Sequence, residues 1–249
     1  MGKKRMAGFT VGIIVLLLVA VFLLAHGRIH RTGNIVLPEI QAEDTGLKDD
    51  ESTESLNVIQ ITPGTVQPAI TTLSRPASYS RTQVVETFWS GGSGRETYEV
   101  AVSGGLTRID LSTPDGGSRH VLLTGQRGAL WYDEDRSWTE FEAGQTDHDA
   151  MQRMPTYEVV RDLPVSQIQK AEYRTTQGGE SCIYVETVPN EAGYGDRYWV
   201  STASGLLIRA ERIQNDKLIY RFTAGPLRED PPEEGLFRLP DGSLLESGE

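Results

Sequence analysis

The chain has 249 residues, with 24 basic and 35 acidic side chains and a formal net charge of -11. The first 31 residues carry five basic side chains and no acidic ones, so the remainder is more acidic than the whole chain. Phosphate groups repel such a surface, which argues against nucleic acid as a partner and against broad electrostatic contact with anionic lipid head groups. The chain has one cysteine, Cys182, so it can form no internal disulfide. The apolar residues around Cys182 predict a buried thiol.

Residues 7–25 form an uncharged, apolar run that follows Lys3, Lys4 and Arg5. A helix of this run would be about 28 Å long, close to the thickness of the hydrocarbon core of a bilayer. The leading positive charges predict that the N-terminus stays in the cytoplasm. We therefore predict a cytoplasmic tail at residues 1–6, a transmembrane signal-anchor at residues 7–26 and an extracytoplasmic location for all that follows. A cleaved signal peptide is the open alternative, although the apolar run is longer than such peptides usually have.

Residues 27–56 are predicted to form an acidic, flexible linker at the cell membrane. Seven acidic side chains between residues 39 and 54 are accompanied by a single lysine, Lys48, and by few large apolar residues. Like charges repel and little apolar surface is available for burial, so the segment is expected to stay extended and solvated.

Residues 57–249 are predicted to form one β-rich domain. Tyr98, Val100 and Val102 share one face of a strand and Glu99 lies on the other. One-sided alternation of this kind predicts antiparallel strands with one buried face, and Gly-Gly pairs mark the turns. Sequential strands are expected to pair as neighbours because most connections are short. The predicted strands are 81–90, 96–103, 106–112, 118–124, 127–133, 136–142, 170–177, 181–188, 196–202, 206–214 and 217–224.

Two segments have helical spacing instead. Val66, Ile70 and Leu73 predict a short helix before the first strand, and residues 146–169 predict two short helical pieces broken by prolines. The expected fold class is therefore α+β and β-rich, with a curved antiparallel sheet whose one face is covered by short helices.

Several local motifs resemble a known family. The runs VLLTG and GALWYD at 121–125 and 128–133, YWVSTASGLLIR at 198–209 and LFRLP at 236–240 are similar to hairpins and to a closing segment of the LolA/RseB-like lipoprotein-carrier superfamily. The resemblance covers residues 57–240. It implies an incomplete β-barrel, with helices closing its mouth around an apolar cavity.

The resemblance also implies a range of functions. Members of the superfamily carry acylated lipoproteins, hold lipids, sense envelope stress or bind proteins, and GerS-like members of Gram-positive spore formers serve germination. The predicted anchor at residues 7–26 differs from the soluble carriers, because a tethered protein does not shuttle between membranes.

No catalytic, metal or cofactor site is predicted. His120 is expected to be an ordinary residue on the face of a strand, and no G-x-S-x-G motif is present. The acidic runs 133–135 and 147–149 lack the spacing of a calcium loop, and the first is expected to be a turn. We therefore predict that the protein is not an enzyme. A hydrolase whose site is assembled from distant residues is kept as a third hypothesis.

Aromatic residues are the candidate binding residues. Core packing is their ordinary role, and lining a ligand cavity or facing a protein partner are the alternatives. The neighbours Trp131 and Tyr132 must point to opposite faces, as must Tyr198 and Trp199. The candidates are Trp89, Tyr98, Trp131, Trp138, Trp199 and Tyr220.

Two functions follow from these candidates. The first is a membrane-tethered, non-catalytic module of the cell envelope that binds a protein partner, in sporulation or germination. The second is binding of a lipid or lipoprotein acyl chain within the barrel. A packed interior with exposed aromatic residues would favour the first function, and an open apolar cavity would favour the second.

Overall fold

The computed structural model describes residues 60–112, 116–133, 136–142 and 153–245. The predicted tail, signal-anchor and linker lie outside the described residues and stay predictions. None of the helices within the described ranges is long and apolar enough to cross a membrane.

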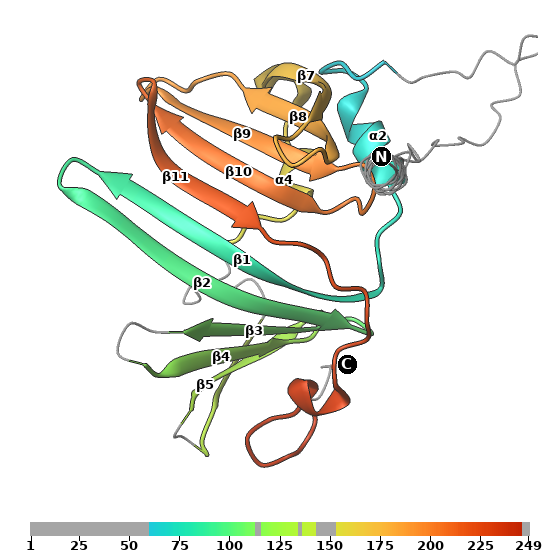
Figure 1. Ribbon diagram of the computed structural model, residues 1–249, viewed down its shortest axis with the longest axis vertical. Coiled ribbons are helices and arrows are strands. Elements are labelled where there is room, and N and C mark those ends of the chain that lie inside the picture. Colours follow the sequence, from blue (N-terminus) through green and yellow to red (C-terminus); the bar gives the residue numbers. More distant parts are fainter. Residues whose placement is uncertain (1–59, 113–115, 134–135, 143–152, 246–249) are drawn as a thin grey trace, which may run out of the picture. The chain divides into compact units, whose positions relative to one another are not determined.

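The described residues form a single antiparallel sheet of eleven strands, shown in Figure 1. Each strand lies where the sequence predicted one, with ends that differ by a few residues at most. The strands are β1 Ser78–Trp89, β2 Gly92–Ser103, β3 Leu106–Ser112, β4 Ser118–Leu123, β5 Arg127–Tyr132, β6 Thr139–Glu142, β7 Ile168–Thr175, β8 Ser181–Thr187, β9 Tyr194–Ser201, β10 Leu207–Gln214 and β11 Lys217–Ala224.

The order of the strands is β6-β5-β4-β3-β2-β1-β11-β10-β9-β8-β7, with β1 in the centre. Sequential strands are neighbours from β1 to β6 and again from β7 to β11, as predicted. The expectation is wrong between β6 and β7, which lie at opposite ends of the sheet, because a long connection with helical pieces replaces a tight turn there. The predicted incomplete barrel is therefore an unclosed sheet.

Cross-strand pairing defines the two faces of the sheet. Val85 lies opposite Phe222, which lies opposite Ala210, and these three residues belong to what we call the inner face. Their neighbours Glu86 and Arg221 point to the other side, the outer face. In the half of the sheet formed by β7–β11, apolar residues mostly occupy the inner face and charged residues the outer face.

Short helices lie on the inner face. Helix α2, Val66–Thr72, buries Val66 and Ile70 completely, as the sequence predicted. Gln67 of α2 donates a hydrogen bond of 2.7 Å to the carbonyl of Arg161, the last residue of α4, Glu158–Arg161. The segment that leads into α4 reaches the inner face, since the hydroxyl of Tyr220 donates to the carbonyl of Arg153. The prediction that helices cover one face is confirmed for the described residues, and η1, Val165–Gln167, follows α4.

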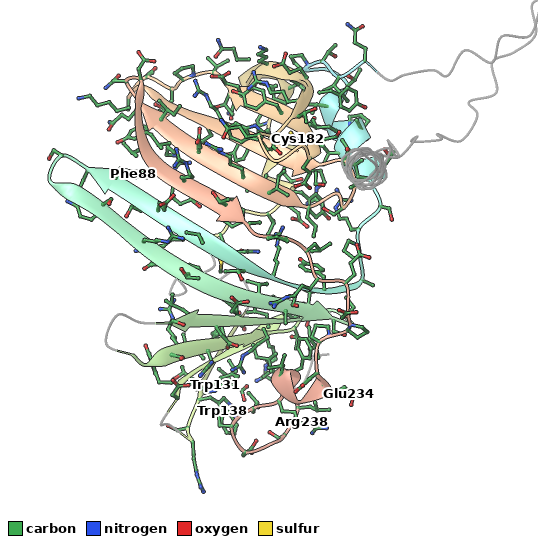
Figure 2. The ribbon with its side chains drawn as sticks, in the orientation of Figure 1. Phe88, Trp131, Trp138, Cys182, Glu234 and Arg238 are labelled. Carbon is green, nitrogen blue, oxygen red and sulfur yellow. The ribbon has the colours of Figure 1, made fainter. Side chains whose placement is uncertain are left out.

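The C-terminal segment covers the opposite face of the other half of the sheet. It contains η2, Glu234–Phe237, and it contributes Phe237, Leu239 and Leu245 to a buried cluster with Leu122 and other outer-face residues of β2–β5. Figure 2 shows Trp131 and Trp138 close to this segment. Both faces of β4 are consequently buried, and the expectation of a single buried face is wrong for this strand.

Turn residues explain where the strands end. Gly104 and Gly105 of the β2–β3 turn both have positive φ angles, +57° and +84°, as a type I′ hairpin turn requires. The β10–β11 turn uses Asn215 and Asp216 with φ angles of 47° and 64° instead. Asn and Asp tolerate this left-handed conformation better than other residues with a Cβ atom, so a hairpin forms there without glycine.

Candidate functional site

The six predicted aromatic residues occupy separate places and do not form one site. Tyr98 and Tyr220 lie on the inner face, and Trp131 lies in the outer-face cluster beneath the C-terminal segment. Trp138 packs on the same cluster just before β6, so its prediction as a strand residue is wrong by one position.

The other two tryptophans, Trp199 and Trp89, lie in two further places. Trp199 lies on the outer face of β9, and Trp89 is 58% exposed at the end of the β1–β2 hairpin. The predicted opposite orientation of neighbouring aromatic residues is confirmed for Tyr198 and Trp199, whose cross-strand partners Ala210 and Arg209 lie on different faces.

Tyrosine side chains fill part of the inner face. Tyr98 is 1% exposed, and its hydroxyl donates to a carboxylate oxygen of Glu96 at 2.9 Å. The Arg153 guanidinium donates to the same carboxylate at 3.0 Å. Burial raises the pKa of Tyr98 and of Tyr220, and the nearby Tyr98 hydroxyl further raises that of Tyr220. These phenols therefore stay neutral and serve as packing and hydrogen-bonding groups.

A cavity of about 300 Å³ lies where β11 leaves the sheet. At about 30 Å³ for each non-hydrogen atom, the share of a water molecule in the liquid, it would hold about ten such atoms. A sixteen-carbon acyl group needs more room than that. The lining includes Arg81, Glu180 and Ser204 together with apolar groups, so this cavity differs from the purely apolar barrel interior that the resemblance implied.

The outer face of β3–β5 carries a polar bridge beside the buried cluster. His120 Nδ1 lies 2.7 Å from Asp110 Oδ1, and His120 Nε2 lies 2.6 Å from Asp133 Oδ1. The hydrogen bond from His120 lowers the pKa of Asp133. Arg108 donates to Asp110 at 2.5 Å and stacks over Trp131, with 4.3 Å from its Cζ to the ring centroid. The expectation that His120 is a strand-face residue is confirmed, and its partners give it a role in holding β3, β4 and β5 together.

A second group of aromatic residues lies on the outer face of the β7–β11 half. The rings of Tyr184 and Trp199 are 5.0 Å apart between centroids and tilted by 59°. The Cζ of Arg174 lies 3.4 Å from the centroid of Tyr184, and the Cζ of Arg209 lies 5.0 Å from that of Trp199. Such distances allow cation–π attraction, so these four side chains form one stack across β7, β8, β9 and β10.

Ion pairs extend this stack to the centre of the sheet. Arg209 and Arg221 both donate to Oε1 of Glu211, each at 3.1 Å from its Nε. The Cζ of Arg221 lies 5.8 Å from the ring centroid of Phe88, which Figure 2 labels on the β1–β2 hairpin. We call the whole row the outer-face array. Its members are Phe88, Arg174, Tyr184, Trp199, Arg209, Glu211 and Arg221.

The outer-face array is open to solvent on one side. The side chains of Arg174, Arg209 and Arg221 are 36%, 41% and 32% exposed. Among the described residues, the helices pack on the inner face and the C-terminal segment packs on β2–β5. The array therefore presents the half-buried rings of Phe88 and Trp199 and three guanidinium groups, packed over Tyr184, which is 2% exposed.

The residues that the structure describes contain no cluster of three or more His, Cys, Asp or Glu side chains that could hold a metal ion. Part of the acidic run 133–135 and all of the run 147–149 lie outside the described residues.

Sequence reasoning missed several of these residues. Arg209 and Arg221 alternate with apolar neighbours and were expected to be ordinary solvent-facing charges, and Arg174 was not singled out. The expectation that Tyr184 packs in the core is confirmed by its 2% exposure, but its place beneath the arginines was not foreseen. The signal was available in the register, because Glu172, Tyr184, Trp199 and Arg209 are successive cross-strand partners. The pairing of strands had to be known before that row could be seen.

The fold and the two faces define a class of protein: an unclosed antiparallel sheet with short helices on one face. No protein-family model matches the chain, and no curated protein matches it. Several solved structures, by contrast, are similar to the chain. An uncharacterized conserved protein from Thermus thermophilus is 10% identical, with 68% of this chain and 90% of that chain covered and a TM-score of 0.45.

Two further solved structures are similar to the chain. A LolA superfamily protein from Nitrosomonas europaea is 9% identical, with 67% of this chain and 93% of that chain covered and a TM-score of 0.33. MucB in complex with MucA(peri) is 17% identical, with 67% of this chain and 56% of that chain covered and a TM-score of 0.35. These structures are what the chain is similar to, at low identity and low TM-score. The GerS-like part of the resemblance stays a prediction.

Proposed function

We propose that this chain is a membrane-tethered, extracytoplasmic binding module of the bacterial cell envelope that docks a protein partner through the outer-face array. Tyr, Trp and Arg are the side chains that most often dominate the binding energy of protein interfaces. The array places the half-buried rings of Phe88 and Trp199 beside three arginines, with their geometry already fixed. Binding to such a surface loses less conformational entropy than binding to mobile side chains. This array is the observation that carries the proposal.

The charge pattern of the array suits a protein rather than a membrane surface or a nucleic acid. Arg209 and Arg221 share Glu211, and Arg174 donates to Glu172 at 2.5 Å, so positive and negative groups alternate. Alternating charges offer a partner matched hydrogen-bonding groups and give no broad positive field. The acidic balance of the whole chain points the same way.

Site-specific photo-crosslinking of the full chain in its host cells tests the proposal. A photoreactive amino acid at Arg174 or Arg209 is expected to capture one discrete protein. The same group at Arg127, a partly exposed outer-face residue on β5, should capture none. Adding the Trp199→Ala substitution to the chain that carries the photoreactive group at Arg209 should abolish the crosslinked product. Identical products from Arg127 and Arg209, or no product from Arg209, would contradict docking through this face.

The location at the membrane is part of the same proposal. It is supported by the apolar run at residues 7–25 and the positive charges before it. Protease added to intact cells without an outer barrier should remove the domain that follows residue 56. Full protection of that domain would contradict an extracytoplasmic location.

The finer part of the proposal is that the partner belongs to the machinery of sporulation or germination, which rests on the GerS-like resemblance alone. Binding of a lipid or acyl chain is the second candidate. Native mass spectrometry of the full chain that finds one retained lipid per molecule would favour it over protein docking.

A further inference from the structure

Cations outnumber carboxylates in the ion pairs in and around the outer-face array. These pairs lie on the outer face of β7–β11 and of the adjacent β1–β2 hairpin, and they share four carboxylates among six cations. The carboxylates are Glu86, Glu172, Glu186 and Glu211, and the cations are Arg95, Lys170, Arg174, Arg197, Arg209 and Arg221. This group of ion pairs therefore has a surplus of two positive charges, although the net charge of the whole chain is -11.

The cations form the outer layer of these pairs. The side chain of Glu211 is 9% exposed, whereas those of Arg209 and Arg221, which both donate to it, are 41% and 32% exposed. Arg95 is likewise more exposed than its partner Glu86, 66% against 26%. A partner that approaches this face therefore meets guanidinium groups before it meets carboxylates.

The guanidinium groups keep hydrogen-bond donors for a partner. Each guanidinium has five N–H groups. Arg174 donates to Glu172 through Nε, and Arg209 donates to Glu211 through Nε and Nη2. These bonds leave three or more N–H groups on each guanidinium. Carboxylate is the acceptor that matches the two parallel N–H groups of a guanidinium, so it is the group that this surface selects.

Trp199 lies between two of these guanidinium groups. The Cζ of Arg174 lies 3.4 Å from the ring centroid of Tyr184, and the Cζ of Arg209 lies 5.0 Å from that of Trp199. Tyr184, Trp199 and Arg209 are successive cross-strand partners on β8, β9 and β10, and neighbouring strands are about 4.8 Å apart. The half-buried Trp199 ring is therefore flanked by a guanidinium on each side, along a line that crosses the strands.

We propose that the partner docks through an extended acidic segment in which two carboxylates, four residues apart, flank a central apolar side chain. This inference rests on the proposed docking function and adds the chemistry of the partner. Every second side chain of an extended segment points the same way, at intervals of about 7 Å. The two carboxylates bind Arg174 and Arg209, and the apolar side chain covers Trp199.

Short peptides with capped ends test this chemistry on the full chain in neutral lipid nanodiscs, with empty nanodiscs as the blank. Fluorescence anisotropy should show saturable binding of a labelled Glu-Thr-Leu-Thr-Glu peptide, with one site per chain. Gln-Thr-Leu-Thr-Gln should bind at least tenfold more weakly, and Glu-Thr-Ser-Thr-Glu at least threefold more weakly. Raising the salt concentration from about 0.05 M to about 0.5 M should weaken binding of the acidic peptide, because the guanidinium groups are partly exposed.

Three outcomes of the peptide experiment would overturn the proposal. They are the absence of saturable binding, equal binding of the glutamate and glutamine peptides, and equal binding of the leucine and serine peptides. The crosslinking experiment reports separately on docking. A crosslinked product from Arg209 without peptide binding would overturn the acidic segment alone and leave the docking function standing.

Substitutions and a matched control locate the segment. Arg174→Gln and Arg209→Gln should each weaken binding of the acidic peptide at least fivefold. Arg209→Lys keeps the charge and loses the paired N–H groups, so it should weaken binding less than Arg209→Gln does. Arg127→Gln changes a similarly exposed arginine on the outer face of β5 and should leave binding unchanged. Equal losses in Arg127→Gln and Arg209→Gln would show attraction to positive charge in general and overturn the assignment to the outer-face array.

Discussion

The two halves of the sheet use the outer face in opposite ways. In β2–β5 the outer face carries an apolar cluster beside the polar bridge of His120, and the C-terminal segment buries that cluster with Phe237, Leu239 and Leu245. In β7–β11 the outer face carries arginines, carboxylates, Tyr184 and Trp199, and no described segment covers it. One continuous sheet therefore has a second core on one half and an open, ordered polar surface on the other. The segments that cover the sheet, and not the pairing of its strands, decide which half of the outer face becomes part of a core.

Removing the covering segment should produce the largest effect. A chain that ends at Glu233 loses three apolar side chains from the outer-face cluster, each contributing about 1.5–3 kcal/mol when fully buried. We expect the free energy of unfolding to fall by about 5 kcal/mol or more. Hydrogen exchange should accelerate in β3–β5 well before it does in β8–β10. A chain that ends at Leu245 is the control and should match the complete protein.

Two tryptophans on the same face provide a matched pair. Trp131 is 7% exposed in the cluster beneath the C-terminal segment, so Trp131→Ala should cost about 3–5 kcal/mol of stability. Trp199 packs against Tyr184 and lies beneath the long, partly exposed side chain of Arg209, so Trp199→Ala should cost about 1–2 kcal/mol. Urea unfolding of both variants measures the difference. Equal losses would show that the two outer faces are buried alike.

Cys182 tests how well the outer-face array shields the strand beneath it. The residue is buried, as predicted from the sequence, and its thiol donates to the carbonyl of Arg174 at 3.3 Å. Burial raises the pKa of the thiol to about 11. A raised pKa means less reactive thiolate at every pH below 11, so labelling at pH 8 should be at least about 100-fold slower than in urea.

The pH dependence of this labelling sharpens the test. In the folded chain the rate should rise about tenfold per pH unit from pH 8 to pH 10, whereas in urea it should level off above the ordinary thiol pKa of about 8.5. A folded-state rate that levels off near pH 8.5 would contradict burial of Cys182 beneath the array.

The smallest effect concerns the ion pairs. Glu211 is 7% exposed and accepts from two arginines, so Glu211→Ala should cost about 1–2 kcal/mol because Arg209 loses its carboxylate partner and Arg221 keeps only Glu86, at 3.7 Å. Glu140, on β6, pairs with Arg127 in an exposed position, and Glu140→Ala should change stability by less than about 0.5 kcal/mol. Chemical unfolding resolves this difference. A larger loss of stability from Glu140→Ala than from Glu211→Ala would contradict this ranking of the two ion pairs.

Local sequence pattern predicted the strands and their turns well. Alternation at Tyr98 and Val100, and helical spacing at Val66 and Ile70, reflect side-chain packing between neighbours, which a sequence records directly. The pattern failed where burial depends on distant segments. Arg108 alternates with Ile109, a pattern that indicates a solvent-facing charge, yet it is 9% exposed because Trp131 stacks on it.

The candidate sites were harder to predict for the same reason. An arginine in an alternating strand indicates a solvent-facing charge, so Arg81 gave no sign of its cavity. Its in-phase spacing with Gln83 and Val85, both buried on the inner face, was the available clue. The outer-face array required the register of six strands, which no local pattern contains.

Hydroxyl-radical footprinting of the full chain, in native membranes and after purification, tests protein docking by the outer-face array most directly. Trp199 should be oxidised slowly in membranes that contain the partner and at least several-fold faster after purification. Trp131 should be oxidised slowly in both states, and Trp89, which is 58% exposed, rapidly in both. Equal oxidation of Trp199 in the two states would show that nothing docks on the outer-face array.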